Sequence, residues 1–187
     1  MKKNITRCGW VKLTDPLYVD YHDQEWGKPI YDDQALFELF SLETQSAGLS
    51  WLTVLKKRDG YREVFEDFKL ERVAKYSDKD IERILESGLV VKSKPKIESI
   101  INNAKLFLEI QKEYGSLKNY FWGRINFNTI TNDVPNLQAL NSSSDLSSNI
   151  TKELKKRGFK FIGSITLYAF MQASGMINDH ENQCHCK

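Results

Sequence analysis

Two cysteines and two histidines near the ends of the chain could together bind a metal ion. Cys8 and His22 lie close to the N-terminus, and His180 and Cys184 lie close to the C-terminus with the spacing His-x3-Cys. Thiolates and neutral imidazoles suit Zn²⁺, and four protein ligands fill its tetrahedral coordination. The pattern indicates a structural zinc ion that joins the two ends. Ordinary buried thiols and surface histidines are the alternative, and the spacing alone favours neither interpretation.

A catalytic zinc site is a rival interpretation of the same residues. Zinc deaminases use a His-x-Glu run and a Pro-Cys-x-x-Cys run, and they keep one metal position open. Here His22 is followed by a glutamate only at Glu25, and no Pro-Cys-x-x-Cys occurs in the sequence. The sequence therefore disfavours a deaminase. His185 and Cys186, which adjoin Cys184, are competing ligands for the C-terminal half of the site.

The N-terminal third combines aromatic residues with a carboxylate in an apolar context. Glu43 lies between the apolar segments 36–42 and 47–51, so we expect it to be partly buried, which is costly without a partner. The aromatic residues of this region are Trp10, Tyr18, Tyr21, Trp26 and Trp51. Rings stack on a flat ligand and a carboxylate accepts its N–H groups, so this set could recognise a nucleobase, above all a cationic one. The alternative, which the sequence favours for the tryptophans as a group, is that they fill the core and that Glu43 caps the next helix.

A basic stretch leads into a glycine turn nearer the C-terminus. Its basic residues are Lys155, Lys156, Arg157 and Lys160. Gly163 and Ser164 follow, and a glycine before a small residue that opens an apolar helix indicates a tight helix–turn–helix junction. Backbone N–H groups at such a junction can bind a DNA phosphate without reading sequence. A plain helix junction with a solvated basic face is the alternative.

Helical periodicity dominates the segments that must position these residues. Between Ile97 and Tyr114 the apolar residues follow one helical stripe, with Ser93 as a candidate N-cap and Pro95 in the first turn. Further helices are expected after Asp33, from Ser77 or Asp78 to Gly88, and from Gly163 to about Gly175. Strand signals are scarce, and residues 126–148 indicate an irregular connection. The predicted fold class is all-α.

The length and composition fit one domain spanning residues 1–187. Of the 187 residues, 41% are hydrophobic and 28% are charged, which excludes a disordered or fibrous chain. No apolar run approaches the length of a membrane span, so no membrane partner is expected. The basic start meets no apolar signal segment, and we therefore expect a cytoplasmic protein. Three cysteines favour free thiols or metal ligands over a disulfide framework.

The net charge of +2 hides two opposed regions. Residues 15–45 hold eight acidic side chains against Lys28 alone, a balance of −7, and residues 151–160 hold five basic side chains against Glu153, a balance of +4. The acidic region contains Tyr21 and Glu43, and the basic region precedes Gly163. These balances predict an acidic, aromatic site for a cationic ligand and a modest grip on phosphate.

Several motifs together resemble the 3-methyladenine DNA glycosylase I family of the helix-hairpin-helix superfamily. They are RCGW at 7–10, DPLY at 15–18, YHD at 21–23, EWG at 25–27, LE at 42–43, AGLSW at 47–51, VLKKR at 54–58, LKKRGFKF at 154–161 and NDH at 178–180. The resemblance runs from Arg7 to about Cys184. It implies two small helical lobes around a cleft, with the helix-hairpin-helix region at about 150–175.

The resemblance also implies roles for individual residues. Cys8, His22, His180 and Cys184 fall on the family's structural zinc ligands, one ion per chain. Glu43 falls on the base-recognition carboxylate, on which catalysis depends. Tyr21 and Trp51 fall on the base pocket, and Trp10 lies in the adjoining motif. Gly163, with Ser164 and Lys160, falls on the hairpin that holds the DNA backbone. Asp179 abuts a zinc ligand, so we interpret it as structural.

The activity implied by the resemblance is hydrolysis of the N-glycosidic bond of 3-methyladenine. The substrate would be double-stranded alkylated DNA, from which a monomeric enzyme flips the nucleotide and releases the free base without cutting the strand. The alternative is a non-catalytic helix-hairpin-helix module that binds DNA and contains a structural zinc. Such a module would share the basic hairpin and the metal, but it would not need Glu43 beside a tryptophan-rich pocket.

Overall fold

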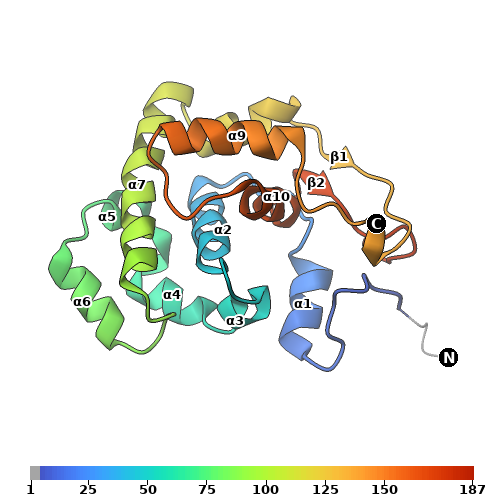
Figure 1. Ribbon diagram of the computed structural model, residues 1–187, viewed down its shortest axis with the longest axis horizontal. Helices are drawn as coiled ribbons and strands as arrows, with labels where there is room; N and C mark the ends of the chain where they lie inside the picture. Colours follow the sequence, from blue (N-terminus) through green and yellow to red (C-terminus); the bar gives the residue numbers. More distant parts are fainter. Residues whose placement is uncertain (1–4) are drawn as a thin grey trace.

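The computed structural model describes residues 5–187, and most of them are helical (Figure 1). The α-helices are α1 (Pro16–Gln24), α2 (Asp33–Gln45), α3 (Trp51–Leu55), α4 (Arg58–Val64), α5 (Leu70–Val73), α6 (Asp78–Glu86), α7 (Lys94–Tyr114), α8 (Leu117–Trp122), α9 (Asp145–Lys156) and α10 (Ser164–Ala173). The 3-10 helices are η1 (Glu66–Phe68), η2 (Gly123–Ile125) and η3 (Leu137–Ala139), and the strands are β1 (Ile130–Thr131) and β2 (Ile177–Asn178). The prediction of a mostly helical fold is confirmed.

Local signals set the boundaries of the helices that carry the site. Asp32 accepts the backbone N–H of Ala35 at 2.8 Å and caps α2. Helix α7 has Pro95 as its second residue and is followed by Gly115 at the C-cap, whose φ of +83° favours glycine. Ser93 stands at the N-cap of α7, but its hydroxyl makes no capping bond, so the expectation that it caps through its side chain is wrong.

The connection predicted to be irregular contains more order than the sequence suggested. Residues 126–148 include β1 and η3, and α9 begins before the predicted connection ends. Strand β1 pairs in parallel with β2, with Ile130 opposite Ile177. The hydroxyl of Ser144 accepts the N–H of Ser147 and starts α9, a serine-rich N-terminus that resembles loop composition.

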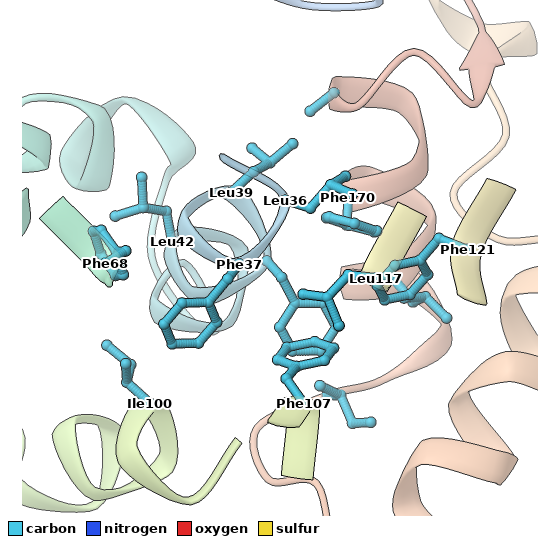
Figure 2. Packing of buried hydrophobic residues seen from close by; sticks show 14 of the residues in the cluster. Leu36, Phe37, Leu39, Leu42, Phe68, Ile100, Phe107, Leu117, Phe121 and Phe170 are labelled. Carbon is cyan, nitrogen blue, oxygen red and sulfur yellow. The ribbon is translucent and has the colours of Figure 1, made fainter. Parts of the chain in front are cut away.

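Helix α2 lies at the centre of the core. It packs against α10, α8, α7, α3 and η1, and its apolar side chains meet a cluster of phenylalanines (Figure 2). Phe40 and Phe107 lie with ring centroids 4.8 Å apart in an edge arrangement, and Phe121 and Phe170 lie 4.8 Å apart. Such pairs contribute beyond the area they bury. This packing fixes the C-terminal end of α2, which carries Glu43.

The two ends of the described chain meet on one side of the molecule. Helices α4, α5 and α6 lie on the far side of α2 from α1 and the C-terminal tail (Figure 1). The N–H of His185 donates to the carbonyl of Thr6 at 3.0 Å. Among residues 5–187, no helix has the length and apolar character needed to cross a membrane.

Candidate functional site

A cavity of about 180 Å³ opens between α1, α2, α3 and α10. Its lining residues are Trp10, Tyr18, Tyr21, Trp26, Glu43, Trp51, Leu140, Ala169 and Gln172. The structure thus brings the four residues predicted for base binding, from four separate segments, to one cavity. Their role in binding stays a prediction, but their convergence gives a flat ligand several aromatic faces and one carboxylate.

Glu43 supplies the carboxylate of the cavity. It lies in the last turn of α2 and is 6% exposed. Burial raises its pKa from 4.5 to about 8, with no neighbouring cation opposing the shift. The alternative that Glu43 caps the next helix is wrong, because Ser50 accepts the N–H of Thr53 at 3.2 Å and caps α3. A buried carboxylate without a partner is the chemistry expected for holding a cationic or N–H-rich ligand.

Aromatic rings form the walls of the cavity. The rings of Tyr21 and Trp51 lie 5.4 Å apart, and Trp10 lies 5.2 Å from Tyr18 and 5.0 Å from Trp26. The indole N–H of Trp51 is buried without a hydrogen-bond partner among the described residues. Trp51 therefore offers the cavity its ring, while its indole N–H lies buried behind that surface.

The expectation that the tryptophans of the N-terminal third fill the core holds for Trp26, which is buried at 7% exposure, but not for Trp10 and Trp51, which are only partly buried. All three line the cavity, so Trp26 belongs to both the core and the cavity wall. The fourth tryptophan, Trp122, is fully buried, and its indole N–H donates to the carbonyl of Ile30 at 2.7 Å. Periodicity could not separate the two groups, since Trp10 and Trp26 lie outside regular helices and Trp51 opens a short one.

Three lining residues were not predicted as site residues. Ala169 and Gln172 lie one turn apart on α10, and Leu140 follows η3. The spacing of Ala169 and Gln172 places them on one helix face, but no feature of the sequence marks that face as a cavity wall. Leu140 gives no signal either.

The four predicted metal ligands converge next to the cavity, where the ring of Trp10 lies 5.3 Å from that of His22 and the ring of Trp26 lies 4.6 Å from that of His180. Cys8 Sγ lies 3.4 Å from His180 Nδ1, and Cys184 Sγ lies 3.5 Å from His22 Nε2 and 3.6 Å from His180 Nδ1. A tetrahedral zinc ion separates its sulfur and nitrogen ligands by about 3.6 Å. All four residues are buried. The donor set and its spacing therefore fit Zn²⁺, and the closed set leaves no ligand position for a catalytic water.

The electrostatics of this cluster also suit a cation. Burial raises the pKa of the Cys8 thiol to about 12 and lowers that of His180 to about 4. Asp23 lies 2.7 Å from His22 Nδ1 and accepts from Arg7, so it orients the imidazole with Nε2 facing the cluster. A zinc ion would supply the positive charge that stabilises the two thiolates.

His185 and Cys186, the competing candidate ligands, are not part of the cluster formed by Cys8, His22, His180 and Cys184. Cys186 Sγ lies 3.4 Å from His185 Nε2, and His185 Nδ1 lies 3.0 Å from the carbonyl of Thr6. Asp179 does not contact His180 through its side chain but binds residues of α10 and the 126–148 connection.

The predicted DNA-contacting residues lie at the junction of α9 and α10. Gly163 is the N-cap of α10, Ser164 is its first residue, and a side chain at Gly163 would meet nothing within 4 Å. Lys160 is exposed, and its backbone N–H and carbonyl both bond the side chain of Asn103. Arg157 instead pairs with Glu113 at 2.7 Å and so contributes little free charge.

Several acidic side chains of residues 15–45 are neutralised by ion pairs. Asp15, Asp23, Glu25 and Glu38 each pair with a basic residue from another segment, at 2.5–2.8 Å. Of the eight acids, the cavity contains only Glu43. Four of the eight acids are thus neutralised by ion pairs, and the expectation that the −7 balance attracts a cationic ligand stays a prediction that depends mainly on Glu43.

These features define a helical protein with an aromatic-walled pocket that contains one buried carboxylate, beside a cluster of residues that fits a structural metal. The chain belongs to the methyladenine glycosylase family, whose model matches residues 10–187. It is 46% identical over 182 residues to the DNA-3-methyladenine glycosylase of Haemophilus influenzae, covering 97% of this chain and 98% of that protein.

Solved structures show the same fold. A crystal structure of 3-methyladenine DNA glycosylase I matches with a TM-score of 0.93 at 42% identity, covering 97% of this chain and 99% of that one. A tyrosine-to-phenylalanine variant of a 3-methyladenine DNA glycosylase I, in complex with 3-methyladenine, matches with a TM-score of 0.90 at 39% identity, covering 92% and 93%.

Proposed function

We propose that this protein is a DNA-3-methyladenine glycosylase of base-excision repair. It hydrolyses the bond between deoxyribose and 3-methyladenine in alkylated double-stranded DNA and releases the free base. The observation that carries the proposal is Glu43, a buried carboxylate without an ionic partner in a cavity walled by aromatic rings. The relatives of the same family, named for this activity, support it along nearly the whole chain.

The mechanism follows from the charge of the lesion. A base methylated at N3 while bonded to the sugar is already cationic, so it leaves without being protonated by the enzyme. The protein must extrude the nucleotide, which costs a few kcal/mol, and hold the base, where stacking on Trp51 returns about 1–3 kcal/mol. Glu43 accepts N–H groups of the base and favours its cationic form, and Tyr21 gives a second polar contact. Water then completes the reaction at the sugar.

No lysine lines the cavity among the described residues, and a Schiff-base nucleophile is therefore not part of the proposal. The enzyme is expected to release the base without cutting the strand. We further propose that it acts as a monomer, since one chain supplies all the residues that line the cavity.

Zinc and the hairpin are the supporting parts of the proposal. Cys8, His22, His180 and Cys184 would hold one structural Zn²⁺, which ties the N-terminal segment that carries Trp10 to the C-terminal tail. The segment from α9 to α10 would act as the helix-hairpin-helix element, with N–H groups at Gly163 and Ser164 facing a phosphate and Lys160 beside them. Helix α10 would then begin at the DNA contact and line the cavity with its next two turns. The two lobes would then be the part around α3–α7 and the part around α1 and the chain ends.

The test is release of bases from methylated double-stranded DNA, with the products identified. The wild type should release 3-methyladenine, and Glu43→Gln should lose most of the excision while keeping its helical content and metal. Full activity of Glu43→Gln would refute the role of the carboxylate. Failure of the wild type both to release and to bind 3-methyladenine would instead favour a DNA-binding module.

A further inference from the structure

Gln172 is a pocket residue whose amide is held by a buried partner. It lies on the cavity face of α10 and is 8% exposed. Its Nε2 donates to Asp179 Oδ2 at 2.7 Å. Its Oε1 accepts no hydrogen bond from any residue among 5–187. This oxygen is also not sealed off from solvent. Gln172 Oε1 is therefore accessible from the cavity that the residue lines.

Asp179 fixes which end of this amide faces the cavity. It is 1% exposed and accepts from the Tyr168 hydroxyl at 2.7 Å and from Asn132 Nδ2 at 2.7 Å, in addition to Gln172. A carboxylate only accepts hydrogen bonds, so the NH₂ end of Gln172 must point toward Asp179. The carbonyl oxygen is thereby committed to the other side. An amide without such a partner could present either end to a ligand.

We propose that Gln172 Oε1 is a specificity-determining acceptor that takes an N–H from the exocyclic amino group of the flipped base, and that Asp179 is the positioning residue that keeps it an acceptor. The inference rests on the proposed function and adds a partner for the base. An amino group carries two N–H donors, so Glu43 and Gln172 can each accept one. A purine with an oxygen at that position would bring an acceptor against Gln172 Oε1, and because Asp179 holds that oxygen in place, the two acceptors face each other without a proton.

The inference predicts discrimination between a 6-amino and a 6-oxo ring. The probes are free 3-methyladenine and 3-methylhypoxanthine, which has oxygen in place of the amino group, and binding is read from quenching of tryptophan fluorescence. The wild type should prefer 3-methyladenine. Gln172→Met has similar length but no acceptor of this strength, so its preference should fall by about tenfold. Gln34→Met is the matched control. Gln34 is exposed in the first turn of α2, at the opposite end of that helix from Glu43, and its replacement should keep the wild-type preference.

Asp179→Asn tests the positioning role with a readout that a structural role would not move. The new amide can donate to Gln172, so the Gln172 amide can turn and present its NH₂ end to the cavity. The ratio of the two dissociation constants should then shift toward 3-methylhypoxanthine, beyond the loss seen in Gln172→Met. Equal weakening of both ligands would overturn the role of Asp179.

The outcomes separate this inference from the proposed function. If the wild type binds 3-methyladenine and Gln172→Met keeps the full preference, the inference is wrong while the function stands. If the wild type binds neither base, the proposed function fails first. Should Asp179→Asn fail to fold, Gln172→Met alone decides the role of Gln172 as an acceptor.

Discussion

Replacing Glu43 by glutamine should stabilise the ligand-free protein, and increasingly so as the pH rises. Burial holds the pKa of Glu43 at about 8, against 4.5 for an exposed glutamate. At 1.36 kcal/mol for each pKa unit, ionising this side chain inside the empty cavity costs about 5 kcal/mol. Glutamine has nearly the same shape and carries no charge, so it avoids this cost.

The direction of the pH dependence follows from the two pKa values. Below pH 4.5 the carboxyl is protonated in both the folded and the unfolded chain, and it contributes no pH dependence. Between pH 4.5 and 8 the unfolded chain has released the proton and the folded chain has kept it, so the free energy of unfolding falls by about 1.4 kcal/mol per pH unit. Above pH 8 the loss is complete. Glu43→Gln lacks this term, and the gap between variant and wild type should widen across that range.

Urea denaturation of metal-loaded protein at several values between pH 5 and pH 8.5 measures this gap. The control is Glu63→Gln, an exposed glutamate on α4, whose profile should run parallel to that of the wild type. A Glu43→Gln profile that also runs parallel would refute the reasoning. It would mean that Glu43 is solvated or paired when no ligand is bound, and its place as the unpartnered carboxylate of the cavity would be lost.

Three further predictions concern the ligand, the metal and DNA. Binding of 3,9-dimethyladenine, a permanent cation, at pH 7 should release close to one proton, because the ion pair lowers the pKa of Glu43. Calorimetry in buffers of different ionisation enthalpy measures this proton release, and Glu43→Gln should release none. Removing zinc by chelation, or Cys184→Ala, should lower the free energy of unfolding by up to about 5 kcal/mol, which is the value of cross-linking the long chain segment between Cys8 and Cys184. An unchanged melting transition with no bound metal would reject the site. Lys160→Ala should weaken DNA binding and lower the salt slope by about 1, whereas Lys79→Ala on α6 should change neither.

The helical fold could be predicted because its signals are local. The apolar stripe of α7 and the glycine before α10 act within one or two turns of chain. The start of α2 was predicted one residue late, because Asp32 and not Asp33 is its cap. The start of α9 was missed because its first turn is rich in serine, and serine serves both loops and N-caps. The two short strands have too few residues to show any alternation.

The site was predicted in part for a different reason. Motifs name the residues that carry distinctive chemistry, such as Glu43 and the cysteines, and the sequence resemblance joined them. Charge counts overstate the free charge of a region because ion pairs form across segments: Arg58 neutralises Glu25, and Arg7 neutralises Asp23. Gln172 was missed because its orientation depends on Asp179, seven residues away, and no local pattern records that bond.

The contact between Thr6 and His185 makes the polypeptide nearly a closed ring. A short flexible linker could join the two ends without moving either half of the metal cluster, because Cys8 and Cys184 already lie side by side there. New ends could then be opened at the exposed residues 141–143, between η3 and α9. Such a circular permutant would make the metal ligands neighbours in sequence. If this permutant folds, the fold requires contact between the two terminal segments and does not depend on their order along the chain.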